Sequence, residues 1–450
     1  MIRRLLFRSF RATSALKYAF LQRFTPAGRL VAAGTAAAAL FGFNTRANLA
    51  YQAFCFLAAL LGLSLVAGLR KRPRFRARCR LPRFGSVGTP VVVSVRVTNG
   101  SPRSQQGLEL GLRLADPRPR FEAFLRSREP REQSRNRFDR AVGYRRWEWL
   151  VSLGRIGRTA PCRVPDLRPG GAADVRVEVT PLRRGRLAVE GVNVWVPEPL
   201  GLIRRPVRLD LPGSVTVLPR LYRVVPVDLS GRRVHQPGGV ALASSVGDAE
   251  EFVSLREYRP GDPIRRIHWR SWAKAGKPIV KEHQEEFFVR HALVLDTFHP
   301  IPGDAPFEEA VSVAASYVSA MSGRESLLDL MFVGTEAYCF TSGRGLAHTD
   351  RMLEILASVS ACTDRSFNDL VPLVMQRVGL LSACLCVFMT WDEDRRRLVS
   401  HLRDRGLPVE VFVVTKPGEA KDLGPGPLAD RPERFHALET GHVEEALSPA

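Results

Sequence analysis

Acidic residues are missing from the first part of this chain. Of its 450 residues, the stretch from Met1 to Arg80 holds no Asp or Glu, although Lys and Arg together occur 15 times in it. The whole chain has a formal net charge of +22, so the other 370 residues carry only +7. A positive charge confined to one segment argues against a general nucleic-acid-binding surface. We therefore expect no specific nucleic-acid partner.

Motifs for catalysis and for metal binding are also missing. The seven cysteines include no C-x-x-C pair, which excludes a zinc knuckle or a dithiol redox motif. The sequence contains no H-E-x-x-H, G-x-S-x-G or phosphate-binding Walker loop. Cys384 and Cys386 alternate along one apolar run, so buried free thiols in a reduced compartment are predicted. We expect no catalytic residues, no cofactor and no enzymatic activity.

Two apolar runs follow the basic N-terminus. Leu30 to Phe43 is short, whereas Leu49 to Leu69 is long enough to cross a bilayer. A polar turn, 44–48, separates them, and basic residues flank both runs. The positive-inside rule then predicts a helical hairpin in the cytoplasmic membrane, with both termini and the soluble domains in the cytoplasm. The alternative for the first run is a signal-peptide core, but no convincing cleavage site follows it.

Alternating apolar and polar residues dominate the next segment. The stretches "VVVSVRVTNG", "LELGLRL", "DVRVEVTPL" and "RLAVEGVNVWV" predict half-buried antiparallel strands, spaced as in a β-sandwich. An insert, 116–150, interrupts them with ten Arg, six acidic residues and several aromatic residues. This mixture is compatible with binding to RNA or anionic lipid. The alternative is a partly disordered loop whose aromatic side chains dock on the sandwich.

Fully apolar strands alternate with amphipathic helices in the last third of the chain. "HALVLDT", "LLDLMFV", "CLCVFMT" and "VEVFVV" read as buried strands, and the segments between them have helical spacing. This order predicts a mostly parallel, doubly wound α/β sheet. The predicted fold is therefore multidomain. Its four parts are two transmembrane helices within 1–72, a β-sandwich-like domain at 73–235, a motif and linker at 236–290, and the α/β domain at 291–450.

The stretch before the α/β domain carries a more specific signal. It reads "YRPGDPIRRIHW", then "AKAG", then "VKEHQEE", and "PEPLGLIRR" stands upstream. With the two apolar helices and the strand ending in Asp, this order resembles the bacterial domain-of-unknown-function-58 family. The resemblance covers nearly the whole chain. It implies a C-terminal von Willebrand factor A-like domain, and as partners a MoxR-type AAA+ ATPase and a transglutaminase-like protein. No biochemical activity is established for that family.

A von Willebrand A domain usually holds a metal ion through Asp-x-Ser-x-Ser at the end of its first strand. Oxygen ligands suit a hard divalent cation such as Mg²⁺. This chain instead has Phe298 and Pro300 where the serines should stand, after Asp296. Asp392 matches the later Asp or caps the helix that follows it. We expect Asp296 and Asp392 to form a degenerate site without metal, in which Asp296 bonds to backbone N–H groups, to Thr297 or Thr390, or to arginines of the motif.

The motif itself allows three interpretations. Its candidate residues are Arg256, Tyr258, Gly261, Asp262, Arg265, Arg266, His268, Trp269 and Glu285. The first interpretation is a scaffolding seam, in which Gly261-Asp262-Pro263 forms a turn, Arg265, Arg266 and Arg270 pair with Glu257, Glu285 and Glu286, and Ile267 and Trp269 bury one face. The second is a partner-docking surface. The third is a metal-assisted hydrolase that uses Glu257, Asp262 and His268.

The favoured hypothesis is a non-enzymatic, membrane-anchored interaction protein that docks a cytoplasmic partner through its C-terminal domain. The alternatives are the hydrolase and a protein that binds anionic lipid or RNA through the insert.

Overall fold

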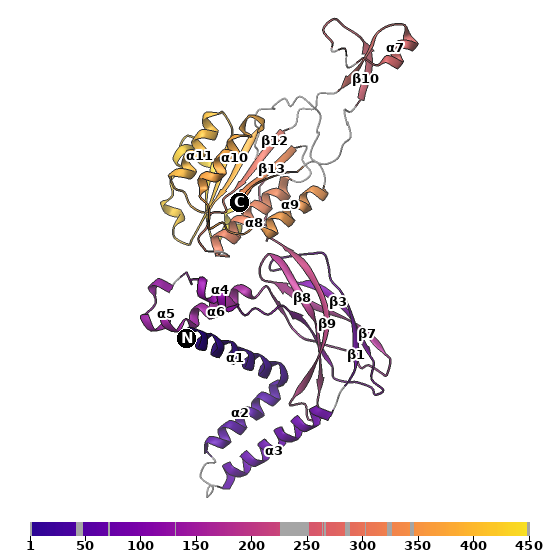
Figure 1. Cartoon of the computed structure of the whole chain (residues 1–450), viewed down its shortest axis with the longest axis vertical. Coiled ribbons are helices and arrows are strands. Elements are labelled where there is room, and N and C mark those ends of the chain that lie inside the picture. The colour runs from indigo at the N-terminus through magenta and orange to yellow at the C-terminus, as the bar shows by residue number, and fades with distance from the viewer. Residues whose placement is uncertain are drawn as a thin grey trace. The chain divides into compact units, whose positions relative to one another are not determined.

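The computed structural model describes residues 2–41, 48–70, 73–130, 132–225, 252–262, 264, 267–283, 289–301, 303–321, 326–342 and 346–447. They form two compact units, Met1–Arg220 and Leu221–Ala450 (Figure 1). The polar turn 44–47 and the motif residues Arg265, Arg266, Glu285 and Glu286 lie outside the described residues.

The first unit begins with three helices, α1 (Ile2–Arg23), α2 (Pro26–Phe41) and α3 (Asn48–Arg70). In the described part of the chain, one helix, at Leu49–Gly68, is long and apolar enough to cross a membrane. α2 is apolar but has only 16 residues. At 1.5 Å per residue it is shorter than the roughly 30 Å hydrocarbon core of a bilayer. The structure thus supplies one candidate span, where the sequence predicted two.

Two sheets follow and share one core. The first has the order β1-β3-β7-β5 and the second β2-β9-β8-β4-β6. Inward-facing valines and leucines of both sheets form a single cluster, as expected for a sandwich of alternating strands. The strands are β1 (Phe75–Arg80), β2 (Phe84–Ser86), β3 (Val91–Asn99), β4 (Glu109–Leu114), β5 (Gly157–Thr159), β6 (Cys162–Arg163), β7 (Ala172–Pro181), β8 (Gly185–Pro197) and β9 (Arg204–Leu218). The strands predicted from alternation are confirmed.

The arginine-rich insert departs from the prediction of a loop docked on the sandwich. It folds into α4 (Phe121–Arg126), a 3-10 turn at Glu132–Ser134, α5 (Arg137–Val142) and α6 (Tyr144–Gly154). Its aromatic side chains pack on α1 in a separate cluster around Phe7, Phe124, Trp147 and Leu150. The Phe7 ring lies 5.2–5.6 Å from the rings of Phe121, Phe124 and Trp147. The insert therefore completes its core with the N-terminal helix.

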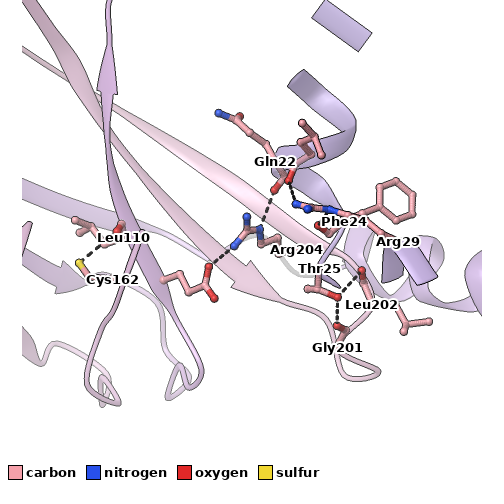
Figure 2. Close-up of polar contacts among 11 residues, drawn as sticks. Gln22, Phe24, Thr25, Arg29, Leu110, Cys162, Gly201, Leu202 and Arg204 are labelled. Carbon is pink, nitrogen blue, oxygen red and sulfur yellow. Dashed lines mark hydrogen bonds and ion pairs between the residues drawn. The ribbon is translucent and has the colours of Figure 1, made fainter. Parts of the chain in front are cut away.

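The corner between α1 and α2 is fixed to the sandwich by "PEPLGLIRR" (Figure 2). Thr25 donates its backbone N–H to the carbonyl of Leu202 (3.0 Å) and its hydroxyl to the carbonyl of Gly201 (2.7 Å). Arg204 donates from Nε to the carbonyl of Gln22 (2.9 Å), at the end of α1. Gly28 sits so close that a Cβ there would lie 2.0 Å from the Leu202 carbonyl oxygen. The "PEPLGLIRR" segment therefore supports the two N-terminal helices, α1 and α2.

The same loop is organised by one buried carboxylate. Glu198 accepts hydrogen bonds from the backbone N–H groups of Leu200 (2.6 Å), Leu202 (2.6 Å) and Ile203 (3.2 Å). Burial of the carboxyl group opposes ionisation, but these hydrogen bonds outweigh it, and the pKa of Glu198 lies below its ordinary value. The charged form of Glu198 therefore holds the loop that in turn holds α2.

The second unit contains a six-stranded sheet of order β14-β13-β12-β15-β16-β17. All neighbouring pairs are parallel except β13 with β14. α10 and α11 contribute to a buried cluster on one face of the sheet, while α8 is almost entirely buried against it. The elements are β12 (Val289–Leu295), α8 (Ala305–Met321), β13 (Ser326–Val333), β14 (Ala337–Ser342), α9 (Leu346–Ser358), α10 (Leu370–Met375), β15 (Ala383–Phe388), α11 (Glu393–Asp404), β16 (Val409–Thr415), β17 (Phe435–Glu439) and α12 (Val443–Leu447).

The family-like motif folds ahead of this sheet as a small hairpin. β10 (Phe252–Glu257) pairs antiparallel with β11 (Ile279–His283), and the short helix α7 (Trp269–Ala275) lies between them in sequence. These two strands form a sheet of their own. We call β10, α7, β11 and the described residues between them the motif hairpin.

Candidate functional site

The first candidate site lies at the carboxyl ends of β12 and β15. The strand order of the sheet reverses between these two strands, and in doubly wound sheets ligands bind outside such a switch point. Asp296 directly follows β12, and Asp392 follows β15 and precedes α11. Both carboxylates therefore lie at the edge of the sheet where the sequence predicts them, at the carboxyl ends of the strands.

Arg395 lies between these two carboxylates. Its Nε and Nη2 atoms donate to Oδ2 of Asp296 at 3.1 and 2.9 Å, and its Nη1 atom donates to Oδ2 of Asp392. The guanidinium also stacks 4.2 Å from the ring centroid of Phe367. Asp296 is fully buried and Arg395 nearly so, which places the ion pair in a medium where charge interactions are strong. Nothing in the sequence marks Arg395 as buried, because "DEDRRRLVS" is typical of the exposed start of a helix.

The remaining oxygen of Asp296 is also occupied. Its Oδ1 atom accepts the backbone N–H of Phe298 at 2.9 Å. The predicted bond to a backbone N–H is confirmed, whereas the arginine comes from α11 and not from the motif. Burial raises the pKa of Asp296 above its ordinary value, and the charge of Arg395 opposes that rise.

Asp392 caps α11, as one of the two sequence interpretations held. Its Oδ1 atom accepts the backbone N–H of Arg395 at 3.1 Å. Arg395, the third residue of α11, thus donates its backbone N–H to the Asp392 cap, and its guanidinium group binds the carboxylates of both Asp296 and Asp392.

A divalent cation does not fit between these residues. Phe298 supplies an aromatic ring, packed 6.0 Å from that of Phe367, where an adhesion-type site needs a hydroxyl. A guanidinium already fills the space between the two carboxylates. Across the described residues, no cluster of three or more His, Cys, Asp or Glu side chains has the geometry to hold a metal.

The second candidate site is the motif hairpin. Arg256 donates from Nη1 and Nη2 to the two oxygens of Asp262, both at 2.7 Å. Asp262 also accepts the backbone N–H of Arg259 at 2.8 Å, and Gly261 before it has a φ of +109°. The hydrogen bond with Arg256, followed by that with Arg259, lowers the pKa of Asp262 to about 2. Asp262 thus accepts a backbone N–H, as expected for the predicted turn, and both of its oxygens are held by one arginine, while Pro263 of that turn lies outside the described residues.

Three other motif residues that the structure describes have partners of their own. His268 shares a hydrogen bond between Nδ1 and the Ser271 hydroxyl at 2.6 Å. Glu257 pairs with Lys277 at 3.2 Å, whereas Arg265 and Arg266, two of its predicted partners, lie outside the described residues. Tyr258 donates its backbone N–H to the carbonyl of Pro278. The hydrolase set of Glu257, Asp262 and His268 is thus distributed over three separate interactions.

Trp269 corrects the expectation that one face of this stretch is buried. The chain is helical from Trp269 onward, with His268 at the N-cap, so alternation does not apply. Trp269 stacks on Trp272, three residues later, with ring centroids 5.3 Å apart. Its side chain is 62% exposed, and that of Ile264 is 67% exposed. The motif hairpin therefore presents large apolar side chains to solvent.

Comparison with known proteins supports the family resemblance. A model of the family described as "Protein of unknown function DUF58" matches residues 254–371. "Uncharacterized protein YeaD" of Bacillus subtilis (strain 168) is 29% identical over 182 residues. That alignment covers 40% of this chain and 44% of the relative, which is less than half of its length.

Solved structures give only distant likenesses. The crystal structure of the CARDB domain of the PF1109 protein from Pyrococcus furiosus has a TM-score of 0.18 at 12% identity, covering 32% of this chain and 89% of that chain. A solution structure of the same domain has a TM-score of 0.17 at 11% identity, covering 33% and 96%. Such scores carry no argument about function.

Proposed function

Residues 254–371 of this chain belong to the family described as protein of unknown function DUF58, and from this premise we propose a non-enzymatic, membrane-anchored interaction protein. In this proposal α3 anchors the chain in the cytoplasmic membrane. The motif hairpin and the C-terminal α/β domain bind a cytoplasmic protein partner. The C-terminal domain is von Willebrand factor A-like.

The observation that carries the proposal is the exposure of Trp269 on a hairpin that is otherwise held firmly. Large apolar side chains cost free energy in water, and aromatic residues dominate the energetics of protein interfaces. The bidentate pair of Arg256 and Asp262 fixes the turn that precedes α7. A rigid support of this kind lowers the entropy that a binding surface loses when a partner docks.

The geometry of the sheet supports the von Willebrand A-like assignment in outline. Asp296 ends the first strand of a doubly wound sheet, and Asp392 stands at the neighbouring strand end. Arg395 supplies the positive charge between them from within the chain. A domain built in this way would bind its partner through side chains, without a bridging metal ion.

The partner that the family resemblance suggests is a MoxR-type AAA+ ATPase, with a transglutaminase-like protein as a second component. Trp269 and Ile264 call for an apolar pocket on that partner. Arg270 and Lys274, which are exposed on α7, call for acidic residues around that pocket.

Binding between purified proteins tests this proposal. The full-length chain in mild detergent is immobilised, and the MoxR-type ATPase of the same genome is titrated over it. We expect saturable binding that Trp269→Ala weakens by about tenfold or more, because a buried interface tryptophan typically contributes about 2 kcal/mol. Val92→Ala is the matched control, since Val92 is an exposed apolar residue on strand β3 of the sandwich, outside both the motif hairpin and the C-terminal domain. Equal binding by wild type and Trp269→Ala would refute this use of the hairpin.

A further inference from the structure

We propose that the outer face of α1 lies on the surface of an anionic lipid bilayer, with the insert helices as its support. This inference rests on the membrane anchor of the proposed function. It adds a second membrane contact and assigns it to a surface other than the arginine-rich insert.

The inner face of α1 already has a partner. Phe7 and Phe10 stand three residues apart and meet the aromatic side chains of α4 and α6. Phe10 packs 5.4 Å from the ring of Tyr144 and 6.2 Å from that of Trp147. This packing fixes the rotation of α1, and among the described residues the opposite face of the helix is exposed.

The outer face combines apolar and basic side chains. Leu5 and Leu16 are eleven residues apart, about three helical turns, and Phe20 follows Leu16 by four residues, so the three form one stripe. Their side chains are 56%, 72% and 39% exposed. Arg8 follows Leu5 by three residues and Lys17 precedes Phe20 by three residues, which places one cation on each flank of the stripe.

The charge of α1 identifies the occupant. All of its charged residues are basic, and those whose side chains are described are exposed, namely Arg3, Arg4, Arg8, Arg11, Lys17 and Arg23. Arg4 also lies over the ring of Phe121, and Arg11 lies near Asp116, but neither contact buries the side chain. Phosphate-bearing lipid headgroups complement such a surface, because basic residues close to an anionic bilayer are attracted to it. An RNA would satisfy the cations but would leave the leucines in water, so the stripe favours a bilayer.

The insert is less suited to this role. Four of its arginines pair with acidic residues within it: Arg118 with Asp116, Arg135 with Glu129, Arg145 with Glu148, and Arg146 with Glu132. These pairs reduce the net charge that the insert offers to phosphates. Its helices instead hold α1 through the aromatic cluster.

The position of α1 next to the candidate span agrees with this assignment. α1 ends at the corner where Thr25 and Arg204 join it to the loop at Gly201–Leu202 (Figure 2). At the end of α3, a Cβ on Gly68 would lie 4.0 Å from Cβ of Glu198, the residue that organises the same loop. One loop thus joins the end of α1, the start of α2 and the end of the only candidate span in the described chain. A helix tied to the end of a membrane span lies near the headgroup layer.

The experiment uses the full-length chain in lipid nanodiscs. A genetically encoded fluorescent amino acid replaces Leu16, and the discs contain phosphatidylcholine either alone or mixed equally with phosphatidylglycerol. We expect the emission to shift to the blue and to be quenched by doxyl-labelled lipid in the anionic discs. Both effects should weaken in the neutral discs and with added salt. A probe in place of Val92, which is exposed on the sandwich strand β3, should respond to neither lipid.

Two variants separate charge from folding. Arg8→Gln/Lys17→Gln/Arg23→Gln should lose most of the quenching at position 16, while Arg96→Gln/Arg158→Gln/Arg176→Gln removes the same charge from the sandwich and should keep it. Fluorescence that is identical in neutral and anionic discs would overturn the proposal. So would a response of the probe to a single-stranded RNA oligonucleotide but not to anionic lipid. Retention of the chain in the discs reports on the α3 anchor, so failure of the anchor and failure of this inference are distinguishable.

Discussion

Arg395 donates two hydrogen bonds, from Nε and from Nη2, to a single carboxylate oxygen of Asp296 that is completely buried. The two residues are 99 positions apart in sequence and meet at the switch point of the C-terminal sheet. A buried carboxylate needs a compensating charge, and here a side chain of the same chain supplies it.

Removal of that arginine should destabilise the C-terminal unit strongly. Arg395→Ala leaves the charge of Asp296 buried without its partner, so we expect a loss of about 3–5 kcal/mol. Arg397→Ala is the matched control, because Arg397 is exposed and its pairs with Glu393 and Asp394 contribute at most about 1 kcal/mol. Thermal unfolding with hydrogen exchange of β12 and β15 measures both. Similar losses of stability in the two variants would show that the buried pair of Arg395 and Asp296 contributes no more than an exposed ion pair.

The joint between α2 and the sandwich should not tolerate a single methyl group. Gly28→Ala brings a Cβ to 2.0 Å from the Leu202 carbonyl oxygen, which forces the helix to shift. Such overpacking typically costs about 1–3 kcal/mol. Gly62→Ala is the control, since a Cβ at Gly62 of α3 meets nothing within 4 Å and improves helix propensity. Hydrogen exchange of residues 24–29 should become faster in Gly28→Ala but not in Gly62→Ala. Unchanged protection in Gly28→Ala would contradict close packing of α2 on the Leu202 loop.

The loop at Glu198 should respond to acid. Because the folded-state pKa of Glu198 is lowered, its carboxylate stabilises the fold above the unfolded-state pKa of about 4.3. That contribution is lost as the pH falls through the lower, folded-state pKa. The melting temperature of the wild type should therefore drop more steeply below about pH 4.3 than that of Glu198→Gln. Parallel pH profiles of the two proteins would exclude this role.

The ion pair of Arg256 and Asp262 in the motif hairpin should depend on its bidentate geometry. Arg256→Lys keeps the charge but cannot bond both oxygens of Asp262 at once. We expect faster hydrogen exchange in β10 and β11, with no change in β12 to β17. Lys277→Ala is the control, because the pair of Lys277 and Glu257 is exposed on both sides. If hydrogen exchange in β10 and β11 is the same in Arg256→Lys and in the wild type, the ion pair of Arg256 and Asp262 does not stabilise the hairpin.

The sequence predicted the elements whose signal is local. In strand β3 apolar and polar residues alternate with a period of two, which predicts one buried face. Strand β15 is apolar throughout, which predicts burial on both faces. Asp392 stands directly before a helix, and its role as a cap could be read from that position.

What the sequence did not predict depends on partners distant in the chain. The aromatic residues of the insert find their core in Phe7, more than 100 residues earlier, so the insert alone resembled a loop. Arg395 and Arg397 are two residues apart on α11 and face opposite sides, but nothing in "DRRRL" marks which one turns inward. The alternation of Ile267 and Trp269 with charged positions predicts a buried face, but helix α7 begins at Trp269, and no side-chain cap at His268 signals that start.

The measurement that tests the metal-free switch point most directly is the melting temperature of the full-length chain with and without millimolar Mg²⁺ or Ca²⁺. A ligand stabilises only the state that it binds, and Arg395 already occupies the place between Asp296 and Asp392. We predict the same melting temperature in chelator, in Mg²⁺ and in Ca²⁺. A saturable rise with Mg²⁺ that disappears in Asp296→Ala would show that a metal ion, and not the guanidinium, completes the site.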